Sequence, residues 1–194
     1  MVEPTRVKKD VQEVEDGATY EGEWNQDGQR DGFGIQIWVD GERYEGQWSN
    51  DMMNDTNGVM TWPDGGGKYV GSYVDNVQSG YGVFEDEESK YTGEWKDDMQ
   101  HGKGEMVRAS GKVYNGEFFE GQRHGQGVCD FPDGSQYDGT WEEDRQCGTG
   151  KFTFPDGKVF EGEFEDDTPG NEGTMTYPEG EVYTGSFEDN KRSG

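Results

Sequence analysis

The sequence predicts an all-β protein, built as a single-layer antiparallel sheet of consecutive β-hairpins. Three observations predict this class: one aromatic position recurs at a nearly fixed period, glycines alternate with other residues around it, and turn-forming residues separate the alternating stretches. Successive positions lie 22 to 25 residues apart, so we interpret residues 20–194 as an array of one supersecondary unit. The repeats begin at Tyr20, Tyr44, Tyr69, Tyr91, Tyr114, Tyr137, Phe160 and Tyr183.

The fifth repeat shows how each repeat is expected to fold. Its opening segment, Tyr114–Phe118, alternates aromatic or glycine residues with polar ones, which is the period of a β-strand. After a polar turn, the segment His124–Phe131 alternates again. Pro132–Gly134 closes the repeat as a turn, because proline presets φ and glycine accepts a positive φ. Each repeat is therefore predicted to be one hairpin.

Side chains alternate across a strand, so each repeat has two faces. We expect the aromatic face to carry the opening aromatic, the first-strand glycine, the second aromatic and both glycines of a Gly-x-Gly, since rings pack well on bare backbone. The structural residues of this spine are Tyr20, Trp24, Tyr44, Trp48, Tyr91, Trp95, Tyr137 and Trp141. An outer column on the same face is expected to be exposed and to bind a partner: Trp38, Trp62, Phe131, Phe154 and Tyr177.

The opposite face is acidic in the first strand of most repeats, but it is not uniform. Its second-strand positions are apolar in the first three repeats and mostly polar in the later ones. Two interpretations stay open: ordinary scatter of apolar surface residues, or a patch that docks on a partner. This N-terminal apolar patch consists of Phe33, Ile35, Ile37, Val59, Tyr81 and Val83.

Composition argues against an ordinary thick core. Only 28% of residues are hydrophobic, 33 are glycine, and the net charge is -26. Such values are typical of disordered chains. The aromatics and glycines are periodic, however, and repeats that contact only their neighbours need no thick core.

The acidic charge also bears on partners. It repels phosphate backbones and anionic headgroups, so nucleic acid is not expected as a partner and membrane binding is disfavoured. We expect protein partners, namely a basic or apolar helix or an extended segment. The chain lacks an apolar run near the roughly 18 residues of a membrane span, and two cysteines make no disulfide framework. The predicted setting is cytoplasmic.

The sequence predicts no catalytic site, no cofactor and no metal site. Paired carboxylates here lack the walled pocket that separates two pKa values, and the glycine doublets lack dinucleotide or P-loop spacing. His101, His124 and Cys147 recur at one repeat position, about 10 Å apart on a regular sheet, which is too far to share one zinc ion. Cys129 is expected to be a small core thiol. Weak calcium binding stays open.

The phrase Tyr-x-Gly-x-Trp, followed by Gly-x-Gly and then Asp-Gly, resembles the MORN repeat. Tyr20–Trp24, Tyr44–Trp48, Tyr91–Trp95 and Tyr137–Trp141 carry its first part. The match covers residues 20–194 as seven complete repeats and a truncated eighth. It implies an elongated, twisted, single-layer antiparallel sheet that serves as a non-catalytic module. MORN proteins occur in cytoskeletal and ciliary assemblies such as radial-spoke heads, in membrane-tethering junctional proteins, and beside lipid kinase and lysine methyltransferase domains.

The residues and the resemblance together predict a non-catalytic protein–protein interaction scaffold. Its setting, a cytoskeletal or axonemal, radial-spoke-like assembly, is implied by the resemblance alone. Two alternatives stay open. One is an adaptor that associates with membranes or phosphoinositides. The other is the regulatory repeat module of an enzyme whose catalytic domain is absent from residues 1–194.

The two ends and three repeats depart from the pattern. Residues 1–19 mix charges without periodicity, which predicts a disordered tail or an arm that folds on a partner. The eighth repeat stops at Gly194, where its second strand would begin. Either the native chain continues, or edge-to-edge self-association or another chain completes that edge. Irregular stretches predict bulges or binding surfaces in the second, third and seventh repeats, at Asn54–Gly58, Glu85–Glu88 and Asn171–Gly173.

Overall fold

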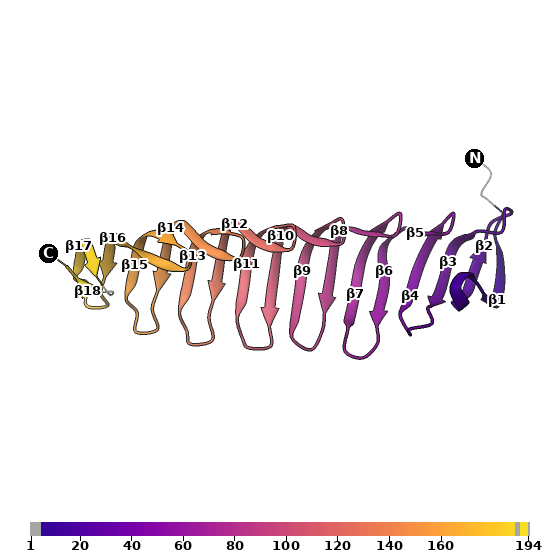
Figure 1. The fold of residues 1–194 in the computed structure, drawn as a ribbon, viewed down its shortest axis with the longest axis horizontal. Helices are drawn as coiled ribbons and strands as arrows, with labels where there is room; N and C mark the ends of the chain where they lie inside the picture. The colour runs from indigo at the N-terminus through magenta and orange to yellow at the C-terminus, as the bar shows by residue number, and fades with distance from the viewer. Residues whose placement is uncertain (1–4, 189–190, 194) are drawn as a thin grey trace. The chain divides into compact units, whose positions relative to one another are not determined.

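The computed structural model describes residues 5–188 and 191–193. The chain divides into two compact units, Met1–Met99 and Gln100–Gly194, called here the N-terminal part and the C-terminal part. In each part the strands pair antiparallel with their neighbours in chain order, as an open sheet of successive hairpins (Figure 1). The described ranges contain no α-helix. The predicted all-β class and the single sheet of consecutive hairpins are therefore confirmed.

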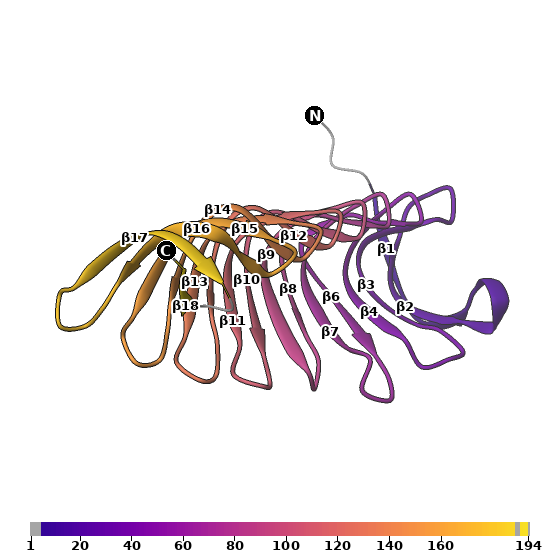
Figure 2. The same ribbon diagram turned by 60° about the vertical axis from the view of Figure 1, so that its left-hand side comes forward.

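The strands of the N-terminal part are β1 (Val7–Glu13), β2 (Thr19–Trp24), β3 (Arg30–Ile37), β4 (Arg43–Ser49), β5 (Met52–Met53), β6 (Asp55–Trp62), β7 (Gly67–Val74), β8 (Val77–Glu85) and β9 (Ser89–Lys96), with a 3-10 turn η1 (Glu15–Gly17) before β2. The strands of the C-terminal part are β10 (Met99–Arg108, beginning one residue before the boundary), β11 (Val113–Phe119), β12 (Gln122–Asp130), β13 (Gln136–Glu142), β14 (Arg145–Thr153), β15 (Val159–Glu165), β16 (Thr168–Thr176), β17 (Val182–Glu188) and β18 (Lys191–Arg192). In the turned view the long strands are visibly curved (Figure 2).

Residues 1–19 were predicted to be a disordered tail or an arm that folds on a partner, and the part of them that the structure describes contains a strand. Residues 7–13 form β1, which pairs antiparallel with β2. Lys9 lies over the Trp24 ring at 4.5 Å, and the Arg6 Nε donates a hydrogen bond to Asp31 at 2.6 Å. All seven side chains of β1 are exposed. A strand held by its backbone and by two cationic side chains has no apolar alternation, so its sequence carries no strand signal.

The opposite end falls partly outside the described residues. Short strand β18 pairs with β17 through Phe187 and Arg192, and through their neighbours Glu188 and Lys191. Gly194, on which the expectation of an incomplete last hairpin depended, lies outside the described residues.

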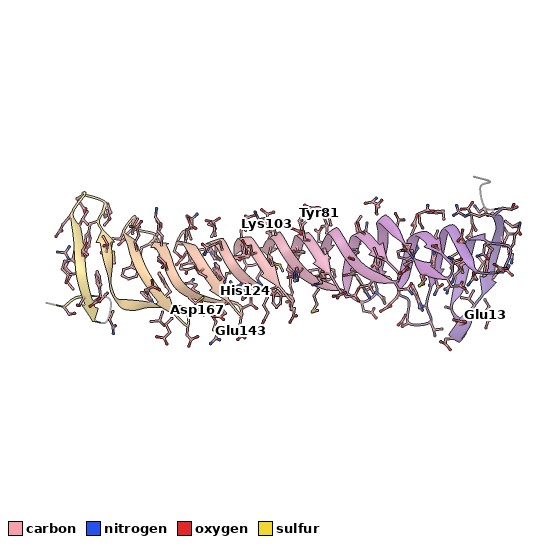
Figure 3. The ribbon with its side chains drawn as sticks, turned by 90° about the horizontal axis from the view of Figure 1, so that it is seen from above. Glu13, Tyr81, Lys103, His124, Glu143 and Asp167 are labelled. Atoms are coloured by element: carbon pink, nitrogen blue, oxygen red, sulfur yellow. The ribbon has the colours of Figure 1, made fainter. Side chains whose placement is uncertain are left out.

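Two-residue turns join the strands inside most repeats. Both central residues have a positive φ, as hairpin turns of type I′ require, and Asn, Asp and Gly favour that conformation. The turns at Glu143 and Asp167 lie along one margin of the C-terminal part (Figure 3). Among the residues that the structure describes, the turns of this kind are Asn50–Asp51, Asp75–Asn76, Asp97–Asp98, Glu120–Gly121, Glu143–Asp144 and Asp166–Asp167.

The second residue of each turn also ties its repeat to the preceding one. The Asp144 backbone N–H donates to the Arg123 carbonyl oxygen at 3.1 Å, and the Asp144 carboxylate accepts the Arg123 backbone N–H at 3.1 Å. We call this reciprocal pair the turn clamp. Gly121 has no side chain and supplies the backbone half alone, to Gln100 at 2.9 Å. Full clamps also join Asp51 to Arg30, Asn76 to Met53, Asp98 to Gln78 and Asp167 to Gln146.

A β-bulge recurs where each second strand enters the sheet. Gly116 pairs with Gly127, whereas the next residue of β11, Glu117, pairs with His124, so two residues of β12 are extra there. The same register shift occurs in regular repeats, after Gly22 and Gly139, and in the irregular third repeat, after Gly71. Bulges are therefore a property of the repeat and are not confined to the departures where they were predicted.

The bulge corrects the expected role of the Gly-x-Gly. Both glycines were expected on the aromatic face beneath rings. The second glycine, Gly127, does lie under Tyr114: a Cβ added to Gly127 would be 2.5 Å from carbon atoms of the Tyr114 ring. The first, Gly125, has a φ of +61° inside the bulge, and a Cβ there would meet Glu117 on the opposite face. A glycine is needed at position 125 because the backbone there has a positive φ, and not because a ring packs on it.

Candidate functional site

The opening aromatic rings form a buried spine over the glycines of the sheet. The opening tyrosine stands over a pair of facing glycines: a Cβ added at Gly139 would lie 2.5 Å from the Tyr137 hydroxyl oxygen. The rings of Tyr137 and Trp141 meet edge to face at 5.3 Å, and Phe164 of the next repeat meets Tyr137 at 4.9 Å. All eight predicted structural residues are at most 9% exposed, namely Tyr20, Trp24, Tyr44, Trp48, Tyr91, Trp95, Tyr137 and Trp141.

The polar atoms of the spine satisfy the backbone at the bulge. The Tyr137 hydroxyl donates to the carbonyl oxygen of Thr140 at 3.0 Å, and the Trp141 indole N–H donates to the Gly127 carbonyl oxygen at 3.0 Å. Equivalent tyrosine bonds recur in other repeats, at 2.9 Å from Tyr91 to Glu94 for example. Trp24 is buried, and its indole N–H is without a partner among the described residues. The tyrosines and tryptophans are therefore structural hydrogen-bond donors as well as packing groups.

Burial controls the acidity of these phenols. Desolvation raises the pKa of Tyr20, Tyr73 and Tyr137 from 10.0 to about 12. The pKa values of Tyr44, Tyr69 and Tyr114 are raised as well, again chiefly by burial. The spine tyrosines therefore stay protonated across the physiological pH range and keep donating to the backbone.

The outer column is partly exposed. All five of its residues, Trp38, Trp62, Phe131, Phe154 and Tyr177, are half-buried. Trp62 packs on Phe84 at 5.9 Å between ring centroids, and Phe152 joins Phe154 at 4.8 Å. Arg192 lies over Tyr177 at 4.6 Å. Each of the five side chains thus leaves part of its surface to solvent, and the partner-binding role of the column stays a prediction.

The N-terminal apolar patch is more exposed than the outer column. Phe33, Ile37 and Tyr81 are 45%, 43% and 61% exposed, and Tyr81 projects from β8 (Figure 3). The other members, Ile35, Val59 and Val83, are half-buried. The pairs Phe33 with Gln47 and Ile37 with Arg43 mix apolar and polar residues across β3 and β4. Its role as a docking patch therefore stays a prediction.

The histidines and cysteines occupy surface and core positions. His101 and His124 both contact the Phe119 ring, at 5.3 and 5.7 Å between centroids. Within the described ranges, no three or more His, Cys, Asp or Glu side chains are grouped so that they could hold a metal ion. Cys129 is fully buried, and burial raises the pKa of its thiol, as expected of a core cysteine. Cys147 is half-buried.

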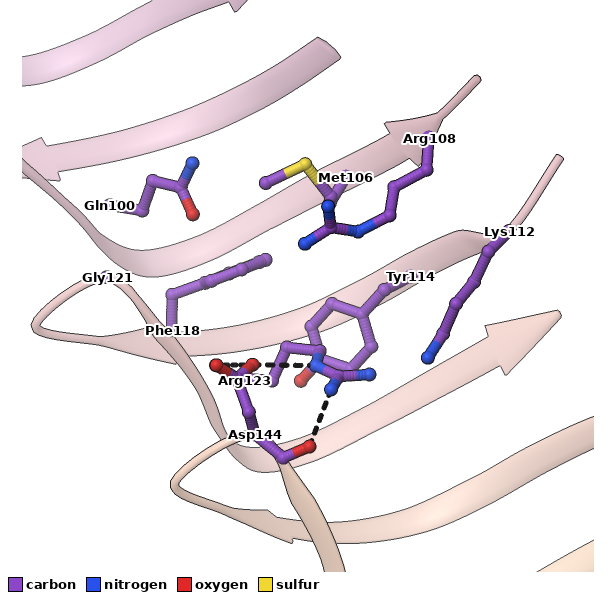
Figure 4. A pocket seen from close by; sticks show the side chains of 9 residues that line it. All are labelled: Gln100, Met106, Arg108, Lys112, Tyr114, Phe118, Gly121, Arg123 and Asp144. Carbon is purple, nitrogen blue, oxygen red and sulfur yellow. Dashed lines mark hydrogen bonds and ion pairs between the residues drawn. The ribbon is translucent and has the colours of Figure 1, made fainter. Parts of the chain in front are cut away.

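Sequence reasoning missed a cavity on the aromatic face of β10, β11 and β12. Figure 4 shows the side chains that line it, and its volume is about 480 Å³. We call it the basic pocket, because Arg108, Lys112 and Arg123 line it above Met106, Tyr114 and Phe118. One signal was present in the sequence: Arg108 occupies the outer-column position that is aromatic in five other repeats.

Comparison with known families gives one extensive match. The MORN repeat family model matches residues 20–43, 44–54, 57–67, 69–87, 91–113, 114–136, 137–159, 160–182 and 183–194. No curated protein matches the chain significantly. Among the described residues, no helix is both long and apolar enough to cross a membrane.

Solved structures resemble the chain only distantly. The Drosophila melanogaster SAS-4 (dCPAP) TCP domain, solved with a proline-rich motif of Ana2 (dSTIL), is 13% identical, with a TM-score of 0.48 over 91% of this chain and 89% of that chain. The Danio rerio CPAP TCP10 domain, solved with a peptide of Danio rerio STIL, is 13% identical, with a TM-score of 0.31 over 94% and 99%. These TM-scores are too low to transfer function.

Proposed function

The chain belongs to the MORN-repeat family, and from this premise we propose that it is a non-catalytic protein–protein interaction scaffold. One observation carries the proposal: a partly exposed outer column of rings lies beside a fully buried spine of rings. The spine already packs the repeats, with Tyr137 and Trp141 at most 1% exposed. The outer rings are half-buried, and large aromatic side chains are the usual anchors of protein interfaces.

The charge of the chain favours a particular kind of partner. With 43 acidic and 17 basic residues, the surface attracts basic segments and repels anionic ones. A basic and apolar helix or extended segment would place its apolar side chains on the outer rings and its cations near the acidic side chains of the surrounding surface. The same charge opposes the alternative function of a membrane or phosphoinositide adaptor.

Replacing one outer ring tests the scaffold. Trp62→Ala removes a half-buried ring that packs on Phe84, and we expect lost capture of specific proteins from cell extract while the far-ultraviolet circular dichroism stays unchanged. Val39→Ala is the matched control, because Val39 is 76% exposed in the turn beside the outer column. Affinity capture with quantitative mass spectrometry compares the three proteins. Equal capture by all three would contradict the proposal, and loss of the β-sheet signal would show that Trp62 is core.

The cellular setting is part of the proposal. We propose a cytoplasmic site in a cytoskeletal or axonemal assembly, such as a radial-spoke-like complex, and the support is the setting in which other MORN proteins occur. Fluorescence microscopy of a tagged chain, followed by detergent extraction that leaves the cytoskeleton behind, tests this placement. Complete extraction with the soluble fraction would contradict it.

A further inference from the structure

The basic pocket lies where the fourth and fifth repeats depart from the pattern. Phe118 stands at the position that is tryptophan in four other repeats, and its side chain is smaller. Gly121 lacks the side chain that completes a turn clamp, and a Cβ added there would meet nothing within 4 Å. Together these two residues leave a cavity of about 480 Å³, a size typical of ligand pockets.

The lining of this cavity is cationic, although the chain as a whole carries -26. Three cations and one carboxylate, Asp144, line it. Asp144 is committed to Arg123, whose Nε donates to the carboxylate at 2.8 Å and whose terminal nitrogen donates to the Asp144 carbonyl oxygen at 2.5 Å (Figure 4). Within residues 5–188 and 191–193, the structure shows no ion pair for Arg108 or Lys112.

The state of Lys112 also indicates unmet positive charge. Its ammonium lies over the Phe131 ring at 4.9 Å. Its pKa is lowered, first by burial and next by repulsion from Arg123, with a smaller contribution of the same sign from Arg108. An anion beside these three groups would offset the repulsion between them and would accept charge-assisted hydrogen bonds from them.

Resting on the proposed scaffold function, we propose that the basic pocket binds an acidic side chain of a partner protein. The carboxylate meets Arg108 and Lys112, and an apolar or aromatic residue beside it packs on half-buried Met106. Charge complementarity selects this occupant. A single carboxylate entering the cavity meets mainly cations, whereas an anionic bilayer would face the acidic field of the whole chain.

The partner segment is therefore of mixed character. Basic and apolar residues suit the acidic surroundings, and one acidic residue next to an apolar one sets the register at the fifth repeat. Opposite charges at defined positions are a common source of specificity in protein interfaces.

The test uses the purified chain and two blocked synthetic peptides, acetyl-Glu-Phe-Glu-Leu-amide and its neutral analogue acetyl-Gln-Phe-Gln-Leu-amide. Titrations are followed by amide chemical shifts in nuclear magnetic resonance. We expect the acidic peptide to bind at least tenfold more tightly, with shifts concentrated in β10, β11 and β12. Equal binding of the two peptides, or shifts centred elsewhere, would overturn the proposal.

Charge variants assign the binding to this pocket. The double variant Arg108→Gln, Lys112→Gln is expected to bind the acidic peptide at least tenfold more weakly than the wild type does. The control, Lys151→Gln combined with Lys158→Gln, removes the same charge from the C-terminal part and is expected to change affinity less than twofold. Unperturbed spectra outside the pocket show that both variants fold. An equal loss in the control would mean that bulk charge, not the pocket, attracts the peptide.

Two further outcomes distinguish peptide binding in the pocket from membrane binding and from the scaffold function of the outer column. Flotation of the wild-type chain, but not the Arg108→Gln, Lys112→Gln variant, with phosphatidylserine vesicles would assign the pocket to a membrane and overturn the proposal. The peptide titration does not depend on Trp62. Its failure would leave the scaffold function standing, whereas equal capture by the Trp62→Ala protein would contradict the outer column while leaving the pocket intact.

Discussion

Asp144 holds Arg123 from two sides: its carboxylate accepts both the backbone N–H of Arg123, at 3.1 Å, and the guanidinium Nε, at 2.8 Å. The held guanidinium then lies over the Trp141 ring at 4.3 Å. A turn of the sixth repeat thus fixes a side chain of the fifth against the spine. Adjacent hairpins are joined by polar clamps at their turns as well as by backbone pairing and ring stacking.

Removing this clamp should lower stability. Asp144→Ala loses the charge-assisted acceptor and places alanine at a φ of +67°, so we expect the free energy of unfolding to fall by about 1–3 kcal/mol. Asp144→Gly separates the two causes, because it loses the same hydrogen bonds without backbone strain and should cost less than the alanine variant. Urea denaturation followed by tryptophan fluorescence measures both. Stabilities within about 0.5 kcal/mol of the wild type would show that the clamp contributes little.

Completing the missing clamp at Gly121 should raise the stability of the protein. Gly121 has a φ of +82°, and aspartate or asparagine occupies the equivalent position in other repeats at +62° to +72°. Gly121→Asp should therefore raise the free energy of unfolding by about 0.5–1 kcal/mol, because its carboxylate accepts the Gln100 backbone N–H. The same carboxylate lines the basic pocket and should weaken binding of the acidic peptide. Gly121→Ala is the control, since it has the strain but no acceptor, and a gain there too would refute the clamp as the cause.

The glycine under a tyrosine ring should contribute more to stability than the hydroxyl group of that ring. A Cβ added at Gly139 would lie 2.5 Å from the Tyr137 hydroxyl oxygen and 2.7 Å from the Gly150 Cα, so Gly139→Ala should cost about 2–4 kcal/mol or prevent folding. Tyr137→Phe keeps the ring, loses the bond to Thr140 and should cost about 0.5–1.5 kcal/mol. Phe160 already fills the equivalent position in the seventh repeat. Thermal denaturation compares the two, and a phenylalanine variant as damaged as the alanine variant would contradict this ranking.

Stability should fall in alkali. The folded-state pKa of Tyr137 is about 12, above its ordinary value of 10.0, so the folded state disfavours the phenolate. This stabilising effect is complete below pH 10 and is lost as the pH rises from 10 through 12, because only the unfolded chain ionises readily there. Urea denaturation at pH 9, 10 and 11 should show a falling free energy of unfolding, and Tyr137→Phe should fall less steeply. Identical pH dependence in both proteins would contradict the assignment to Tyr137.

Particular residues show how far sequence reasoning reached. Tyr20, Trp24, Tyr137 and Trp141 were predicted to be structural residues of the spine. All four are buried, because a fixed period places the same ring over the same glycines in every repeat. The strand β1 was missed, since exposed side chains such as those of Val7 and Val11 produce no pattern. Whether the outer column and the apolar patch bind partners stays a prediction.

By itself, the sequence determined the repeat, the hairpin and the spine, because each follows from residue types recurring at a local spacing. The role of Gly125 depends on tertiary structure, since in the bulge a Cβ on this residue would point toward Glu117 and away from the rings. The tertiary structure also brought Arg108, Lys112 and Arg123 together around one cavity. Their convergence depends on register between three strands and on the space left by Phe118 and Gly121. Such relationships between strands leave no periodic trace along the chain.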